Sequence, residues 1–180
     1  MKHIYVVISQ TNSIVSRLIS KLTGDKYSHA SISLDKELDT MYSFGRIFPN
    51  NPFIGGFVKE SPHYGTMKKF GNANIVVIQL EVANDKFDEV NEYIQTMYAN
   101  RRKFRYNTIG LFLAKFGMHF HRDNHFYCSE FVKALLEKFN LVEKNKFVDP
   151  VRPAELLGID GKVVYCGKLC EYARLTHSTW

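Results

Sequence analysis

The sequence predicts an α+β protein in which helices pack against an antiparallel sheet. Short segments rich in β-branched and aromatic residues alternate with amphipathic segments along the 180 residues, as expected of strands and helices. The chain contains no Gly/Ser linker, low-complexity tract or internal repeat, so we expect residues 1–180 to form one domain. A chain of this length and 45% hydrophobic content buries a core large enough to need no disulfides.

The first half of the chain supplies most of the expected strands. We expect a strand at 4–8, a helix at 11–24, strands at 27–35 and 40–48, and a loop around a short strand at 49–64. The loop is expected because "PNNPFIGGFVKESPHY" holds three of the five prolines in the chain.

The second half is expected to be mainly helical. It comprises a buried strand at 73–82, a helix at 84–101, an apolar helix at 106–117, a helix beginning at Cys128, a loop at 148–158 that leads into a short helical turn, and a late strand at 162–167. The strand "ANIVVIQLEV" at 73–82 has the most continuous apolar pattern.

Composition narrows the function and the compartment. The net charge is +6, but apart from "RRKFR" at 101–105 the basic residues are scattered, so we do not expect nucleic-acid binding. The N-terminal apolar run is too short for a signal sequence or a membrane span. Three cysteines, an odd number, indicate a reducing compartment, and we expect a cytoplasmic protein. The oligomeric state stays open.

Two segments carry the residues suited to chemistry. Cys128 is expected in the first turn of a helix, where unpaired N–H groups and the helix dipole stabilise a thiolate. A thiolate is useful as a nucleophile only with an imidazole in hydrogen-bond reach. In the strand at 27–35, alternation places His29 on the same face as Ser31 and Ser33, as in a strand that lines a polar cleft. His29 is therefore the candidate base.

These segments resemble a known family. "YSHASISLD", followed about a hundred residues later by "FYCSEFV" at the start of a helix, resembles the circularly permuted papain-like hydrolases of the NlpC-like superfamily. The branch in question includes the YiiX-like proteins and the lecithin:retinol acyltransferase group, in which the catalytic histidine precedes the cysteine. "FRYN" at 104–107 and "VDPVRPAELL" at 148–157 match more loosely, so the resemblance covers about residues 3 to 160.

The resemblance implies a permuted papain-like fold and a role for each site residue. Cys128 would be the nucleophile, with its N–H as an oxyanion donor, and His29 would be the general base. Tyr127 would lie near the oxyanion site. The third polar residue of the family falls on Ser43, whose hydroxyl would orient the imidazole without stabilising its charge as a carboxylate does. Asp35 or Asp39 are other candidates for this role. We assign Glu130 to simple compensation of the helix dipole.

The resemblance implies a cysteine amidohydrolase, peptidase or acyltransferase. It would act on an amide, ester or thioester bond through an acyl-enzyme on Cys128, with no cofactor. The partner would be a small-molecule, peptide or lipid-like acyl substrate. Four aromatic residues near the proline-rich segment could line an acyl pocket, but packing beneath their own loop is the favoured interpretation: Phe44, Phe48, Phe53 and Phe57.

Two other functions are compatible with the same residues. Because Ser43 is a poor substitute for a carboxylate, the chain could be a non-catalytic ligand-binding domain that keeps the fold. Alternatively, the segment "HFHRDNHFYC" could bind zinc, since it holds four potential ligands within ten positions: His119, His121, His125 and Cys128. The spacing matches no zinc motif that we recognise.

Overall fold

One sheet forms the centre of the molecule. The computed structural model describes residues 1–11, 24–48, 51–69, 71–114 and 116–177, with backbone alone for 51–53. The strands are β1 (Lys2–Gln10), β2 (His29–Ser33), β3 (Met41–Phe48), β4 (Asn51–Glu60), β5 (Asn74–Val82), β6 (Arg105–Tyr106), β7 (His125–Phe126) and β8 (Lys162–Lys168). They lie in the order β7-β6-β4-β3-β2-β1-β5-β8, and all neighbours are antiparallel except β6 and β7. The predicted α+β class with an antiparallel sheet is confirmed.

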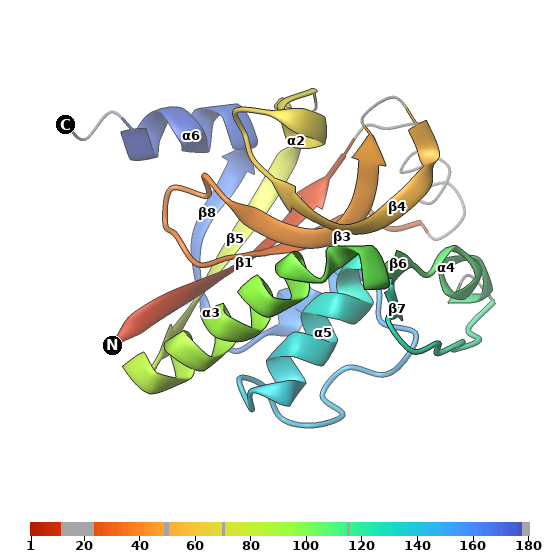
Figure 1. Cartoon of the computed structure of the whole chain (residues 1–180). Coiled ribbons are helices and arrows are strands. Elements are labelled where there is room, and N and C mark those ends of the chain that lie inside the picture. The colour runs from red at the N-terminus through yellow and green to blue at the C-terminus, as the bar shows by residue number, and fades with distance from the viewer. Residues whose placement is uncertain (12–23, 49–50, 70, 115, 178–180) are drawn as a thin grey trace.

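Helices cover both faces of this sheet. They are α2 (Gly65–Lys69), α3 (Asn84–Ala99), α4 (Thr108–Ala114), α5 (Cys128–Lys138) and α6 (Leu169–His177), with 3-10 turns η1 (Arg101–Lys103) and η2 (Pro153–Gly158). Figure 1 shows α3 and α5 on one side of the sheet and α2 and α6 on the other. The start of α5 lies close to the short strands β6 and β7, so the cysteine helix begins at one edge of the sheet.

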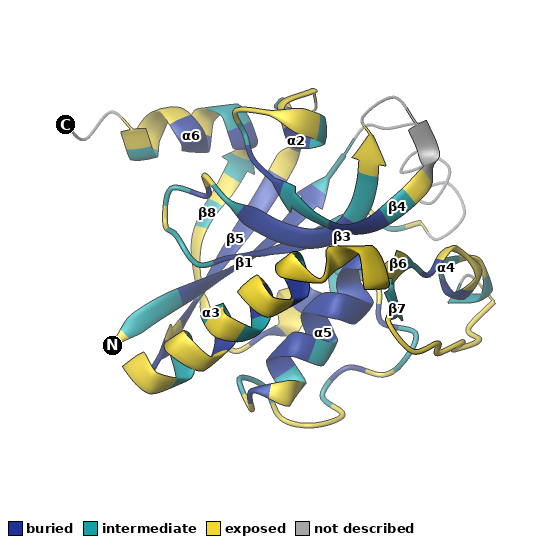
Figure 2. Cartoon of the chain, viewed as in Figure 1, coloured by how far each residue is buried: buried dark blue, intermediate teal, exposed yellow. Residues whose placement is uncertain are grey.

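Alternation along the strands builds a core on each face. In β1, Ile4, Val6 and Ile8 face α3 and α5, whereas Tyr5 and Val7 face α2 and α6. The buried stripes of the helices complete these two layers (Figure 2). Within the described residues no helix combines the length and the apolar character that crossing a bilayer requires.

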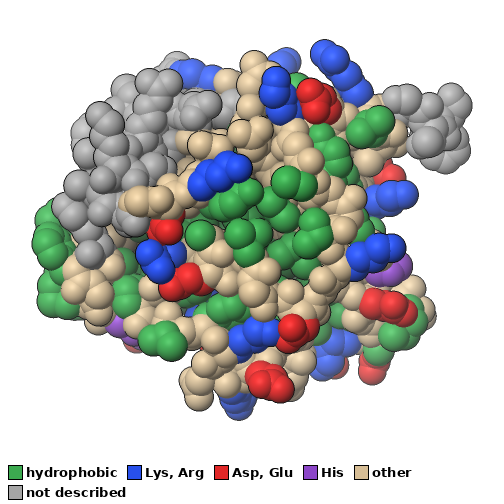
Figure 3. All heavy atoms as spheres, turned by 180° about the vertical axis from the view of Figure 1, so that it is seen from behind, with side chains coloured by type: hydrophobic (Ala, Val, Ile, Leu, Met, Phe, Trp, Pro, Cys, Tyr) green, Lys and Arg blue, Asp and Glu red, His purple; other side chains and the backbone are tan. Residues whose placement is uncertain are grey.

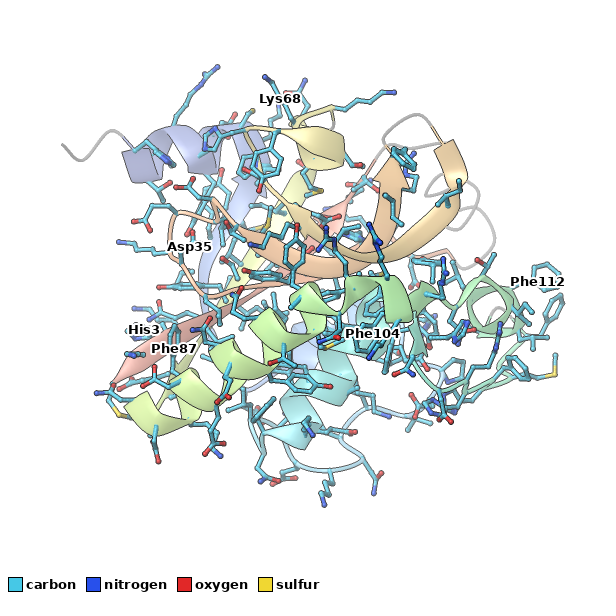
Figure 4. All side chains as sticks on the ribbon, viewed as in Figure 1. His3, Asp35, Lys68, Phe87, Phe104 and Phe112 are labelled. Carbon is cyan, nitrogen blue, oxygen red and sulfur yellow. The ribbon has the colours of Figure 1, made fainter. Side chains whose placement is uncertain are left out.

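Aromatic side chains form the part of the core beneath α5. Phe44 and Phe57 are buried, and each has its ring centroid within 5.5 Å of that of Phe131. Phe104, labelled in Figure 4, packs against the same two rings. Phe44 and Phe57 therefore pack in the main core against α5, and not beneath a loop of their own as expected, because the segment forms the strand β4. Phe48 is exposed, and the side chain of Phe53 lies outside the described residues.

The sequence-based prediction was wrong for 49–64, which was expected to be mainly loop. Instead β4 runs for ten residues and pairs with β3 from Glu60 opposite Met41 to Asn51 opposite Phe48. Gly55 and Gly56 lie within this strand. A Cβ atom at Gly55 would lie 2.8 Å from the Cβ of Tyr106, so β4 needs glycine where β6 pairs with it.

Several other elements differ from the expectation. The helix expected at 11–24 falls on residues 12–23, which lie outside the described part of the chain. The sequence analysis also missed α2, α6, β6 and β7, all of them short. The basic run at 101–105 begins with the exposed turn η1, and Figure 3 shows basic and acidic side chains interspersed over one face of the molecule.

Candidate functional site

His29 lies at the first position of β2, within a buried polar cluster. Its Nε2–H donates to both carboxylate oxygens of Glu60, at 3.0 Å and 2.9 Å. The Ser31 hydroxyl donates to Glu60 Oε2 at 2.8 Å, so two residues of the same strand face hold this carboxylate. The predicted polar face of β2 therefore exists, and a carboxylate is its centre.

Glu60 is the residue that sequence analysis missed. It is the last residue of β4, and its side chain must reach across β3 to meet His29. Gly45 makes that reach possible, because a Cβ there would lie 3.2 Å from Glu60 Oε1 and 3.7 Å from the His29 ring. A glycine inside a strand can indicate that another side chain approaches the backbone closely. The sequence shows this glycine, but which side chain approaches it depends on the strand register.

Cys128 is the first residue of α5 and is buried. Its thiol lies close enough to the His29 imidazole to raise the pKa of His29. Because Glu60 occupies Nε2, the ring nitrogen left for sulfur is Nδ1. The structure thus brings together the two predicted segments, separated by 99 positions, into one Cys–His–Glu arrangement.

The charges of this cluster support one another. Burial alone would lower the pKa of His29, but the Glu60 carboxylate and the hydrogen bonds to Cys128 and Glu60 raise this pKa well above 6.5. Burial would raise the pKa of Glu60, but the His29 charge and the hydrogen bonds from His29 and Ser31 lower it below 4.5. The imidazole is therefore held in its charged form beside the sulfur.

Ser43 does not contact the imidazole in this structure. It is buried, and its hydroxyl donates to the carbonyl of Ala30 at 2.6 Å. The alternatives Asp35 and Asp39 lie elsewhere too. Asp35 accepts N–H groups of the β2–β3 turn, and Asp39 pairs with His63. The position that we assigned to Ser43 is thus filled by Glu60, because the carboxylate comes from β4 and not from β3.

The charge of Cys128 acts on two tyrosines, Tyr127 and Tyr106. Tyr127 is buried at the N-cap position of α5, and among the described residues its hydroxyl has no hydrogen-bond partner. Burial, then the charges of Glu130, Asp149 and Cys128, raise the pKa of Tyr127. Burial and the charge of Cys128 likewise raise the pKa of Tyr106, in β6, well above 10. Both phenols therefore stay protonated.

The four zinc candidates do not gather as one set. Cys128 is directed to His29, and the His125 ring donates from Nδ1 to the carbonyl of Asp123 at 2.8 Å. His119 and His121 instead lie near Glu130.

A separate cavity of about 360 Å³ between α2 and α6 is lined by residues such as Lys68 and Cys170, and it includes none of the residues above.

Comparisons with known proteins assign no family to this chain. No protein-family model matches the sequence, and no curated protein matches it. The functional argument therefore depends on the geometry of the site together with the resemblance of its motifs.

Proposed function

We propose that this protein is a cysteine hydrolase or acyltransferase with Cys128, His29 and Glu60 as its catalytic group. The observation that carries the proposal is the placement of one buried imidazole between a carboxylate and a thiol at a helix start. A nucleophile, a base and a third group that orients the base are the parts that covalent acyl transfer needs.

The chemical steps follow from this geometry. The proton of the Cys128 thiol is held on His29 Nδ1, so the pair reacts as thiolate and imidazolium, and the sulfur attacks the carbonyl carbon of an amide, ester or thioester. The tetrahedral intermediate collapses as the bond to the leaving group breaks, and His29 returns the proton to that leaving group. Water or an amine then loses a proton to His29 and attacks the thioester, which releases the acyl group and the Cys128 thiol.

The start of α5 is suited to hold the oxyanion. The first N–H groups of a helix have no partner within the helix, and the helix dipole favours negative charge there. The N–H of Cys128 is one of these groups, and it belongs to the residue that carries the sulfur. Tyr106 is the last residue of β6, and its protonated phenol could donate a second hydrogen bond to the oxyanion.

The fold gives this proposal further support. The histidine comes from a sheet strand and precedes the cysteine of the helix, which is the order in the circularly permuted papain-like hydrolases that the motifs resemble. We therefore propose the permuted papain-like fold for this chain. Its described cysteines are all free, which fits a reducing, cytoplasmic environment.

Exposed apolar side chains on α4 suggest that the partner of this protein has an apolar part. Helix α4 directly follows Tyr106 and exposes Ile109 and Phe112, with Phe112 directed away from the sheet in Figure 4. Large apolar side chains on a surface indicate a partner that covers them. Among small-molecule, peptide and lipid-like substrates, we propose those whose acyl group is itself apolar.

The test is acylation of the protein by thioesters and p-nitrophenyl esters of acetate and octanoate, followed by intact mass. We expect an adduct on Cys128, faster with octanoate, and none on Cys128→Ala. Cys166→Ala is the matched control, because Cys166 is an exposed cysteine on β8 and its loss should leave the adduct in place. A folded wild-type protein that forms no adduct would favour the non-catalytic ligand-binding domain.

A further inference from the structure

A second group of ionisable side chains lies at the start of α5. His119 Nε2 is 3.6 Å from Glu130 Oε1, and His121 Nδ1 is 3.8 Å from the same oxygen. One ligand atom from each of these three residues lies within 4.8 Å of the other two. Both imidazoles therefore converge on a single carboxylate oxygen from outside the helix.

Glu130 Oε1 is the observation that indicates a ligand. The Glu130 side chain is only 6% exposed, yet among the described residues this oxygen has no hydrogen-bond partner. A buried carboxylate oxygen without a partner is costly, so such groups are normally paired or bound to metal. Both histidines lie beyond hydrogen-bond distance, which leaves the oxygen facing them without contact.

We propose that His119, His121 and Glu130 bind a Zn²⁺ ion. Zn²⁺ bonds of about 2.0–2.1 Å at tetrahedral angles place neighbouring ligand atoms roughly 3.3–3.5 Å apart. The observed separations from Glu130 Oε1 exceed this by only a few tenths of an ångström. Two imidazoles and one carboxylate suit Zn²⁺ better than Mg²⁺ or Ca²⁺, which prefer oxygen alone. The fourth position is open to solvent.

Neighbouring residues hold these ligands in place. Asn107, which is fully buried, donates from Nδ2 to the carbonyl of Phe120, the residue between the two histidines. The same amide group lies 3.5 Å from Glu130 Oε2, which also accepts the N–H of Tyr127 at 3.2 Å. Asp123 lies 3.8 Å from His121 Nε2, on the side of the ring away from Glu130. At this distance Asp123 makes no hydrogen bond with the ring, and it would have to move closer to orient a metal-bound histidine.

This ligand set differs from the one expected from the sequence. It excludes Cys128, which contacts His29, and His125, whose ring donates to a backbone carbonyl. It adds Glu130, for which we expected only dipole compensation. The inference therefore does not rest on the proposed hydrolase activity, although a bound ion would tie the segment 119–121 to the helix that carries Cys128.

The test is Zn²⁺ titration of the metal-free full-length protein by calorimetry, with X-ray absorption of the loaded form. We expect one site whose affinity falls at least about 100-fold in His119→Ala and in Glu130→Gln. Glutamine keeps an acceptor for the Tyr127 N–H, and His119 is exposed, so at least the histidine variant should fold normally. Absorption should show nitrogen and oxygen ligands alone.

Two control variants make the result decisive. His125→Ala removes a histidine of the same segment, and His63→Ala disrupts the other described cluster, in which Asp39, His63 and His177 are all exposed. Both should retain the tight site. The proposal is overturned if wild type binds no Zn²⁺, if His63→Ala abolishes the binding while His119→Ala retains it, or if a sulfur ligand appears at about 2.3 Å.

Discussion

The two histidine–glutamate clusters at the start of α5 use the same residue types with opposite geometry. Glu60 and His29 are in direct contact at 2.9 Å, and the imidazole is mostly buried. Glu130 is equally buried, but its two histidines are partly exposed and stand 3.6 Å and 3.8 Å away. The two clusters are only two positions apart on the helix, at Cys128 and Glu130.

Separation decides what each cluster can hold. At 2.9 Å a nitrogen and an oxygen share a proton, and no metal ion fits between them. At 3.6 Å and 3.8 Å no hydrogen bond forms, but the gap is close to that between two ligands of one ion. Residues at i and i+2 of a helix face different directions, so Cys128 and Glu130 can serve the two clusters separately. A nitrogen–oxygen separation that is larger by 0.7 Å to 0.9 Å thus distinguishes the proposed metal site from the proton site.

The largest effect is expected from removing the imidazole of the first cluster. His29→Ala should lower the rate of acylation by octanoyl thioester about 10³-fold, within the range that a positioned acid–base group contributes. The thiol loses the group that accepts its proton, and Glu60 cannot replace it because it contacts His29 and not the sulfur. Intact-mass measurements on reactions stopped at successive times would give the rate of acylation.

The same variant checks the independence of the two clusters. Zn²⁺ affinity should be unchanged in His29→Ala, since none of its contacts involves His119, His121 or Glu130. A joint loss of acylation and Zn²⁺ binding in a folded variant would mean that the two clusters form one site.

A smaller effect is expected from Glu60→Gln, and it should depend on pH. Acylation should fall roughly 10²-fold, less than the ~10⁴-fold loss when a serine triad loses its carboxylate, because a thiol needs less activation. The alkaline limb of kcat/KM should move to lower pH. This limb reports the loss of the His29 proton. Without the Glu60 charge, burial becomes the dominant effect, and burial lowers the pKa of His29. An unmoved limb would contradict the role of Glu60.

Two residues of the candidate site could be predicted from the sequence. The third could not, because its position depends on how the strands pair. Cys128 at a helix start and His29 on a polar strand face follow from local periodicity. Glu60 does not, because its contact with His29 depends on the register of β3 with β4 and on the missing side chain at Gly45. Pairing between strands is a long-range property that a local pattern leaves open.

The metal ligands show the same limit. The histidines were conspicuous, but the fixed spacing within one segment suggested His125 and Cys128 as companions. The proposed site has Glu130 in place of both, because the chain between His121 and α5 passes through β7, where the His125 ring donates to the carbonyl of Asp123. Spacing along the sequence therefore did not indicate which side chains lie close together in the fold.

A third effect concerns stability and its pH window. Because folding lowers the pKa of Glu60, its charge stabilises the fold above pH 4.5, and this stabilisation is lost as the pH falls through the pKa of Glu60 in the folded state. Because folding raises the pKa of His29, its charge stabilises the fold below pH 6.5, and this stabilisation is lost as the pH rises through the pKa of His29 in the folded state. Glu60→Gln should therefore cost about 3 kcal/mol, the lower end for breaking a buried pair. The cost should be largest between pH 4.5 and 6.5 and shrink on either side, as urea unfolding would show. A cost independent of pH would argue against a charged pair.

The smallest effect is expected from Ser43→Ala, and it separates the two candidates for the third group. The Ser43 hydroxyl donates to the Ala30 carbonyl and is fully buried, so its loss should cost about 1 kcal/mol of unfolding free energy. Its distance from the proton path should leave the acylation rate within roughly threefold of wild type. Glu60→Gln, the matched variant, should lose both rate and stability. If Ser43→Ala slowed acylation as much as Glu60→Gln, the hydroxyl on β3 would orient the imidazole during catalysis after all.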